Sequence, residues 1–409
     1  MRAINNLLIL VVVQYILLIV SLEPEYPSKN FVVRLNKLFI YDKQRISEND
    51  YCGDSRIFCD KDDRISEVLL EHAHLSKFPS FITMINDTLS KFTYRGLKGE
   101  IPSQIYELTE LRLLRLIDGD CPVNLSDNIG KLLHLKYLNL GNLGMRGKVP
   151  NSLYSLTGLT YLGLEGNNFT GFLSDDIQRL AYLWMLNLGR SGLSGPIPNG
   201  LYTLTLLASI DLSDNSFNGS LSNSIEGMSG LYRIRLSNSG LSGSIPDRLY
   251  SLKRLRYLDL SNNGISGVLS PNIDGLVDVV EMNLSYNRLG GPIPKGIAKL
   301  TRLRTLLLQG NRFEGDIPNF SSMRNLVHME ITSTRPLNAK CDDGVLPPNI
   351  SRNECLIGPV SVLCNNVTRC RYTDGSTGKS SVGSMLHTYR LKMIAVVLVC
   401  IGGIEIMLD

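Results

Sequence analysis

Residues 183–198 read LWMLNLGRSGLSGPIP, and this stretch decides the fold because its pattern returns every 24 residues. A leucine stands at each of nine positions with that spacing, namely Leu116, Leu140, Leu164, Leu188, Leu212, Leu236, Leu260, Leu284 and Leu308. Strict self-similarity is the signature of a solenoid, in which each repeat buries its apolar face against its neighbours. The 409 residues therefore need not divide into the two or three globular domains that this length would otherwise suggest.

Each position of the repeat has a readable physical role. Leucines at 180, 183, 186 and 188 follow the pattern Leu-x-x-Leu-x-x-Leu-x-Leu, whose final alternation predicts a short strand with leucines inward and the residues between them outward. Three residues after each anchor comes a polar residue that can bond to turn amides along the whole stack: Asn167, Ser191, Asn215, Ser239, Asn263, Asn287 and Asn311. With a shortened final unit around Met329, the sequence contains about ten repeats.

A second period of 48 residues overlies the first. Repeats that contain Pro150, Pro198, Pro246 and Pro294 alternate with repeats that carry FLSDDI, SLSNSI or VLSPNI instead. We interpret this alternation as the duplication of a two-repeat block.

Both ends of the chain resemble processing signals. The apolar run at 7–20 predicts a secretory signal peptide over residues 1–22, with a retained signal anchor as the alternative. The apolar run at 393–408 is short for a membrane span, which needs roughly 20 residues. A lipid-anchor (GPI) signal over 385–409, with attachment at Ser384, is the favoured prediction, and a transmembrane helix is the alternative.

The cysteines flank the repeats, where a solenoid needs caps. We expect disulfides in an oxidising compartment among Cys52, Cys59, Cys341, Cys355, Cys364 and Cys370. Cys121 occupies a repeat position that is apolar elsewhere, so we expect a buried free thiol, and Cys400 lies in the tail. Eight Asn-x-Ser/Thr sequons support a glycosylated, extracellular chain: Asn86, Asn124, Asn168, Asn218, Asn283, Asn319, Asn349 and Asn366.

Composition excludes several classes of function. The net charge is only +4 and both signs are mixed along the chain, whereas a nucleic-acid-binding protein shows a basic stripe. The five histidines fall into no nucleophile or metal-binding motif, so we expect no enzyme activity, no metal and no cofactor. The expected boundaries are an N-terminal cap at 23–75, repeats at 76–331, a cysteine-containing cap at 332–370 and a polar linker at 371–384.

The repeat resembles the plant-specific class of leucine-rich repeat, found in receptor-like kinases, receptor-like proteins and polygalacturonase-inhibiting proteins. Residues 183–198 and 282–294 carry its pattern, and the resemblance covers about residues 60–331. It implies an α/β solenoid, a right-handed leucine-rich-repeat superhelix with a parallel concave sheet and disulfide-containing caps. Helical spacing of Phe31, Leu35 and Phe39 fits a cap helix, although the adjacent cysteines and tryptophan of the family's N-terminal cap are missing.

The resemblance also implies recognition on the concave face, where two groups of outward residues stand out. The first is an aromatic group of Tyr137, Tyr161 and Trp184, and the second is an aromatic and basic group of Tyr232, Arg233, Arg235, Arg256 and Tyr257. Tyrosine, tryptophan and arginine supply much of the binding energy at interfaces, although the same residues also suit an ordinary solvated strand surface.

We therefore expect a cell-surface or extracellular binding protein that recognises a protein or an acidic glycan and signals through a co-receptor. The alternative is a secreted inhibitor of a microbial cell-wall hydrolase, similar to the polygalacturonase inhibitors.

Overall fold

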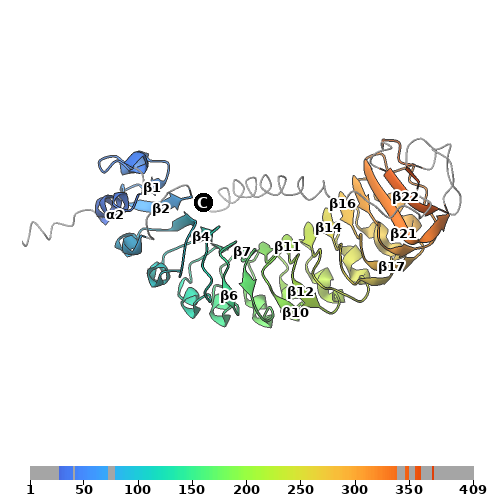
Figure 1. The fold of residues 1–409 in the computed structure, drawn as a ribbon, viewed down its shortest axis with the longest axis horizontal. Helices are drawn as coiled ribbons and strands as arrows, with labels where there is room; N and C mark the ends of the chain where they lie inside the picture. Colours follow the sequence, from blue (N-terminus) through green and yellow to red (C-terminus); the bar gives the residue numbers. More distant parts are fainter. Residues whose placement is uncertain are drawn as a thin grey trace, which may run out of the picture.

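The computed structural model describes residues 27–39, 42–71, 79–338, 346–349, 355–360 and 371–372. They form a long arc in which the strands of one sheet line the inner side and short helices line the outer side (Figure 1). The predicted cap helix is present as α2 (Pro27–Asn36), which buries Phe31, Val32 and Leu35 against the first repeats. The predicted leucine-rich-repeat solenoid is confirmed.

Sixteen strands of the described residues belong to the inner sheet. Successive repeats pair in parallel and in register, so that residues 24 apart become neighbours, as with Tyr137 and Tyr161. The strands in spatial order are β1 (Ile57–Cys59), β2 (Ile65–Leu70), β3 (Lys91–Arg95), β4 (Leu113–Ile117), β5 (Tyr137–Asn139), β7 (Tyr161–Gly163), β9 (Met185–Asn187), β11 (Ser209–Asp211), β13 (Arg233–Arg235), β14 (Tyr257–Asp259), β16 (Glu281–Asn283), β18 (Thr305–Leu307), β21 (His328–Asn338), β22 (Cys355–Val360) and β23 (Arg371–Tyr372), with β20 (Gly315–Asp316) beside β21.

The outer side of each repeat is a five-residue 3-10 helix. The helices along the repeats are η4 (Ser103–Glu107), η5 (Asp127–Lys131), η6 (Asn151–Ser155), η7 (Asp175–Arg179), η8 (Asn199–Thr203), η9 (Asn223–Gly227), η10 (Asp247–Ser251), η11 (Pro271–Gly275) and η12 (Lys295–Lys299). Earlier turns are η1 (Asp42–Gln44), η2 (Tyr51–Gly53) and η3 (Ser80–Ile85). A 24-residue repeat leaves only a few residues for its outer side, and 3-10 helices are the usual form of such short helical segments.

Between the inner sheet and the helices, the chain forms additional short parallel sheets that the sequence pattern did not predict. They pair β6 (Arg146–Gly147) with β8 (Asn168–Phe169), β10 (Ser194–Pro196) with β12 (Ser216–Asn218), and β15 (Ser266–Val268) with β17 (Arg288–Gly291) and β19 (Arg312–Phe313). These sheets add backbone hydrogen bonds between neighbouring repeats.

The polar position after each anchor builds the predicted ladder. The side-chain amide of Asn263 donates to the carbonyls of Leu260 (3.0 Å) and Leu236 (2.7 Å), and its oxygen accepts from the backbone nitrogens of Ser239 and Leu241 (both 3.0 Å). The same amide donates to the carbonyl of Ser261 at 3.1 Å, so one side chain contacts five backbone groups in two repeats, which a buried turn requires. Asn167, Asn215, Asn287 and Asn311 bridge in the same way.

The 48-residue period also has a structural basis. Three of the four repeats of the proline class carry a buried tyrosine on the helix, namely Tyr154, Tyr202 and Tyr250, whereas the fourth has Ala298 at this position. The backbone nitrogen of Ser222 donates to the hydroxyl of Tyr202 at 3.3 Å. Ser222 in turn caps η9 by accepting from the nitrogen of Ser224. Tyr154 and Ser174 repeat this arrangement at 3.4 Å. In both cases a hydrogen bond from the backbone to a tyrosine hydroxyl joins a repeat of the proline class to the repeat that follows it.

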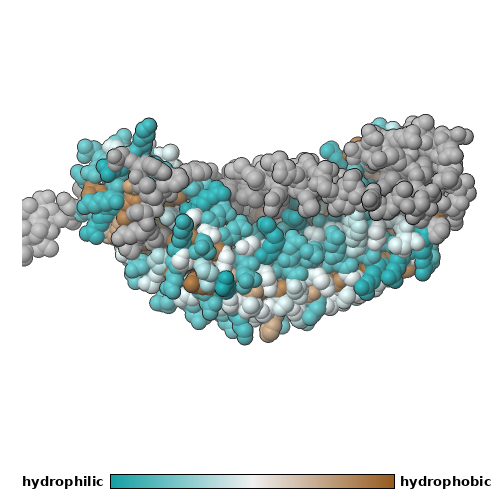
Figure 2. Space-filling view, in the orientation of Figure 1, coloured by the Kyte–Doolittle hydropathy of each residue, from teal (hydrophilic) through white to brown (hydrophobic). Residues whose placement is uncertain are grey.

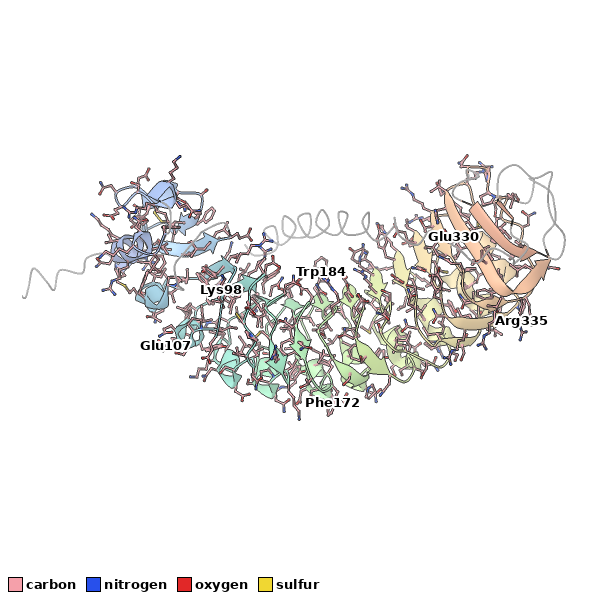
Figure 3. All side chains as sticks on the ribbon, viewed as in Figure 1. Lys98, Glu107, Phe172, Trp184, Glu330 and Arg335 are labelled. Atoms are coloured by element: carbon pink, nitrogen blue, oxygen red, sulfur yellow. A yellow bond between two sulfur atoms is a disulfide. The ribbon has the colours of Figure 1, made fainter. Side chains whose placement is uncertain are left out.

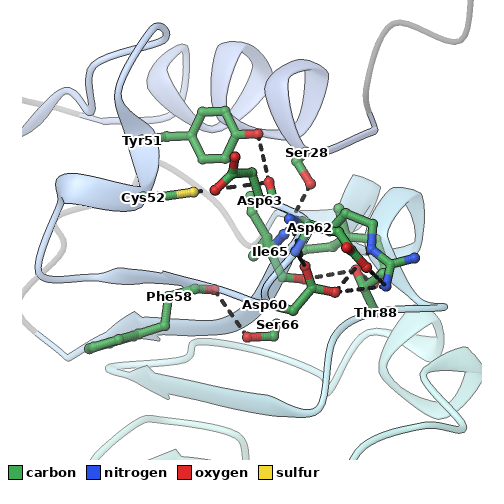
Figure 4. Close-up of polar contacts among 12 residues, drawn as sticks. Ser28, Tyr51, Cys52, Phe58, Asp60, Asp62, Asp63, Ile65, Ser66 and Thr88 are labelled. Carbon is green, nitrogen blue, oxygen red and sulfur yellow. Dashed lines mark hydrogen bonds and ion pairs between the residues drawn. The ribbon is translucent and has the colours of Figure 1, made fainter.

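Both caps continue the sheet. At the N-terminal cap, Cys52 and Cys59 form the expected disulfide, with Cα atoms 5.7 Å apart. The nitrogen of Ile65 donates to the hydroxyl of Ser28 at 3.1 Å, which joins α2 to β2 (Figure 4). At the other end β21 and β22 pair in parallel. Cys341, Cys364, Cys370 and the side chain of Cys355 lie outside the described residues, as do the expected signal peptide, the linker, Ser384 and the tail.

The surface of the arc is mainly hydrophilic, with isolated apolar spots (Figure 2). Within the described ranges, no helix has the length and apolar character that crossing a membrane requires.

Candidate functional site on the concave face

Parallel register places the outward residues of successive repeats in rows that run along the inner sheet. One row, called row A, holds the first residue of each short strand, from Tyr137 and Tyr161 through Met185 and Ser209 to Arg233 and Tyr257. Row B lies two residues later and contains Asn139, Gly163, Asn187, Asp211, Arg235, Asp259 and Asn283. Row C lies one residue before row A and contains Trp184, Tyr232 and Arg256. All the predicted site residues occupy these rows.

The aromatic group divides into a buried pair and an exposed residue. The rings of Tyr137 and Tyr161 stack with centroids 4.2 Å apart and planes 10° apart, and only 8% and 7% of these residues remain exposed. Trp184 stands in row C on the concave side, opposite Phe172 on the convex side, and is 38% exposed (Figure 3). The register permits this stacking, because it pairs Tyr137 with Tyr161 on strands about 4.8 Å apart. Only Trp184 of the three offers a large free surface.

A carboxyl that the sequence analysis did not single out lies beside the tyrosine pair. Glu165 follows β7 in line with Tyr161 and Gly163, and its Oε2 atom is buried with no hydrogen-bond partner. Its side chain fills the space over two glycines, since a Cβ at Gly163 would lie 2.8 Å from Glu165 Oε2 and a Cβ at Gly141 would lie 2.5 Å from Oε1. Burial, with a contribution from Asp211, raises the pKa of Glu165 to about 7.

The aromatic and basic group is brought together on β13 and β14. The guanidinium carbon of Arg233 lies 4.1 Å from the centre of the Tyr257 ring and 5.7 Å from that of Tyr232. The two tyrosines meet edge to face, with centroids 5.9 Å apart. All three are partly exposed, so they offer a cationic and aromatic surface to a ligand. We call Tyr232, Arg233 and Tyr257 the RY patch.

Arg235 is placed differently from Arg233, because it lies in row B between two aspartates. Its Nη1 is 3.4 Å from Asp211 Oδ2, and Asp211 and Asp259 accept hydrogen bonds from Ser213 and Ser261. Burial raises the pKa of Asp259, while Arg235 opposes this shift. The charge of Arg235 is thus largely compensated within the protein. The 24-residue spacing of Asp211, Arg235 and Asp259 could have predicted this contact, since it places the three residues next to one another in row B.

The sequons fall on different faces. Asn86, Asn124, Asn168, Asn218, Asn319 and Asn349 are exposed, Asn283 is half-buried on β16, and Asn366 lies outside the described residues. The side-chain oxygen of Asn283 accepts from the hydroxyl of Ser285, the third residue of its own sequon, at 2.7 Å. Glycosylation of all eight remains a prediction, and a glycan at Asn283 would end the accessible concave surface there.

Two further features of the described residues concern metal binding and thiol reactivity. No group of three or more His, Cys, Asp or Glu side chains in the described part of the chain is arranged to hold a metal. Cys121 is buried and free, as expected, and its thiol contacts the carbonyl of Leu97 at 3.5 Å. Burial raises the pKa of that thiol to about 11, which keeps it protonated and unreactive at neutral pH.

Comparison with known proteins places this geometry in a family. The family model of the leucine-rich repeat matches residues 158–180, 254–276 and 278–300. Comparison with curated protein sequences finds no significant match. The fold and the repeat pattern are those of leucine-rich repeats, and the chain is similar to leucine-rich-repeat proteins of the plant type.

Solved structures with this fold include plant receptor ectodomains. The Arabidopsis receptor kinase HAESA, in complex with the peptide hormone IDA and the co-receptor SERK1, is 25% identical over 76% of this chain and 62% of that chain, with a TM-score of 0.64. The plant peptide hormone receptor RGFR1 in complex with RGF2 is 27% identical over 72% and 47%, with a TM-score of 0.61. This chain thus matches only about half to three fifths of these receptor chains. A plant ice-binding protein is 25% identical over 73% and 91%, with a TM-score of 0.58.

Proposed function

We propose that the chain is an extracellular, non-enzymatic receptor-like protein that binds a peptide ligand along its concave face, with the RY patch as the centre of the contact. The observation that carries this proposal is the stacking of Arg233 on Tyr257 at 4.1 Å, on a partly exposed strand surface. An arginine held by aromatic rings loses little side-chain entropy when a ligand binds.

The remainder of the concave face supports a polar, extended ligand. Row B provides asparagine, aspartate or arginine side chains at every position listed above except Gly163, and these suit hydrogen bonds to a peptide backbone. The similarity to receptors solved with peptide hormones supports the same class of ligand. Signalling would then pass through a membrane-anchored co-receptor, and the C-terminal tail would anchor this chain by a lipid or a helix.

The test is capture of a ligand from a plant cell-surface extract. The full chain, produced in plant cells with its glycans, is compared with a variant that carries Arg233→Glu. We expect a peptide or protein that the native chain retains and the variant loses at least tenfold. Retention by both chains would contradict binding at this patch. Capture of a microbial cell-wall hydrolase instead would favour the inhibitor hypothesis.

A further inference from the structure

A hollow of about 410 Å³ opens beside the RY patch, on the side from which the chain enters the strands. Its walls are Arg256, Tyr257, Asp278, Val280, Arg302, Arg304 and Asn325. Tyr257 belongs both to this hollow and to the RY patch, so a ligand lying on the patch reaches the hollow directly. The volume falls in the range of small-ligand sites and exceeds that of a single amino-acid side chain.

Two arginines of the same row, Arg256 and Arg304, line the hollow. Consecutive backbone hydrogen bonds, from Val280 to the carbonyl of Arg256 and from Arg304 to the carbonyl of Val280, both 2.8 Å long, place the three residues on successive repeats. With strands about 4.8 Å apart, the two arginines start roughly 10 Å from each other. Val280 between them is too short to fill the space, so the hollow has a cationic rim and an apolar floor.

The positive charge of the rim is not compensated within the described part of the chain. Arg302 is held by Asp278 at 2.6 Å, so that pair is neutral. For Arg256 and Arg304, by contrast, no carboxylate of the described residues lies within 4.0 Å; Glu281, next to Val280, forms no such ion pair either. Both arginines are exposed. Guanidinium groups bind carboxylates through paired, charge-assisted hydrogen bonds.

The shape of the charged region indicates which kind of anion fits. Along row C the residues next to this pair of arginines are Tyr232 on one side and Val327 on the other, and both are uncharged. Along row C from Tyr232 to Val327, the positive charge is therefore confined to Arg256 and Arg304. A polyanionic glycan would need a continuous basic track, whereas a single carboxylate on an aliphatic stem matches two arginines above a valine.

We propose that this hollow binds the carboxylate of one acidic residue of the ligand, held between Arg256 and Arg304 while its aliphatic part packs on Val280. The proposal rests on the peptide-binding function and assigns a charge to one position of the ligand. The position lies beyond the RY patch towards the C-terminal repeats.

Titration calorimetry at low salt tests this directly, with acetyl-tetraglutamate amide as the probe and the full chain as the host. Three proteins are compared: the native chain, Arg256→Gln with Arg304→Gln, and a control with Arg288→Gln and Arg312→Gln. The control arginines are also exposed but lie on β17 and β19 in the second sheet. We expect equal affinity for the native chain and the control, and at least tenfold weaker binding by the Arg256 and Arg304 variant.

Three results would overturn the proposal: no binding of the probe to the native chain, equal loss in both variants, or preferential binding of trigalacturonate at the same residues. Circular dichroism confirms that each variant is folded, and Arg304→Gln alone provides a milder variant.

Capture of the cell-surface ligand separates this proposal from the proposed function. If the Arg256 and Arg304 variant still captures that ligand with native affinity, the ligand does not bind in the hollow, while the proposed function stands. If the probe binds as expected but no ligand is captured by any protein, the proposed function is contradicted and the anion site stands.

Discussion

The guanidinium of Arg233 lies over the ring of Tyr257, with its central carbon 4.1 Å from the ring centre. The two residues are 24 apart in sequence and are direct partners in the register of β13 and β14. A repeat protein thus builds a preorganised contact from two ordinary outward positions. Arg235, only two residues away, is instead bound to Asp211. The two arginines of one strand therefore differ in their availability to a ligand.

The asparagine ladder predicts a large loss of stability from one substitution. Asn263→Ala removes five hydrogen bonds to backbone groups in two repeats. The nitrogens of Ser239 and Leu241 lose their acceptor, and each unpaired backbone group costs about 1–3 kcal/mol. We expect a reduction of about 3 kcal/mol or more in the free energy of unfolding, measured in guanidinium chloride. Asn272→Ala, at an exposed position on η11, is the control and should change it by less than about 0.5 kcal/mol. Equal effects would contradict the role of the ladder.

The hydrogen bond between Tyr202 and Ser222, which joins two neighbouring repeats, predicts a smaller loss of stability than Asn263→Ala. Tyr202→Phe removes the acceptor for the nitrogen of Ser222 while keeping the buried ring, so we expect a loss of about 1 kcal/mol in unfolding free energy. The exposed Tyr182 provides the control substitution Tyr182→Phe. A Tyr202→Phe protein as stable as the control would show that the 48-residue period reflects duplication alone.

The sequence predicts those features of the molecule that recur in every repeat better than those that occur once. Leu188 and Cys121 occupy positions that recur in nine repeats, and Asn263 occupies one that is polar in seven, so their burial and bonding follow from the period. The stacking of Tyr137 on Tyr161 does not, because an outward position alone does not say whether a ring faces solvent or its neighbour. Strand β22 lies after the last repeat, where no period exists to predict it.

The site residues divide in the same way. The RY patch could be predicted because arginine and tyrosine stand at adjacent outward positions. Glu165 was missed, since it follows the strand and its burial depends on Gly163 and Gly141 having no side chains. Arg256 was predicted as part of the patch, but the hollow that it forms with Arg304 arises from the small size of Val280, which only the structure shows.

Glu165 predicts a dependence of stability on pH. Its pKa in the folded chain is raised to about 7 from an ordinary value of 4.5, so the folded state binds more protons than the unfolded state between these values. The stabilisation is complete below pH 4.5 and is lost as the pH rises through 7, with a total of up to about 3 kcal/mol. Glu165→Gln should remove this part of the pH profile of unfolding. An unchanged slope between pH 5 and 7 would contradict the assignment.

Cys121 predicts selective protection of one thiol. Burial and its pKa of about 11 should prevent alkylation by iodoacetamide at pH 7.5 in the folded chain, whereas unfolding should expose it. Peptide mass spectrometry of the segment around Cys121 measures this, with and without guanidinium chloride. Alkylation in the native chain at the rate of an exposed thiol would show that the repeat opens there.

The central claim is that the ligand contacts the RY patch, and the most direct measurement is the dissociation constant of the captured ligand for two matched double variants. One carries Arg233→Ala and Tyr257→Ala. The other carries Arg146→Ala and Phe172→Ala, which are also an arginine and an exposed aromatic residue but lie away from the concave strands. The account predicts at least a hundredfold weaker binding by the first variant and native affinity for the second. Native affinity for the first variant, or an equal loss in both, would contradict it.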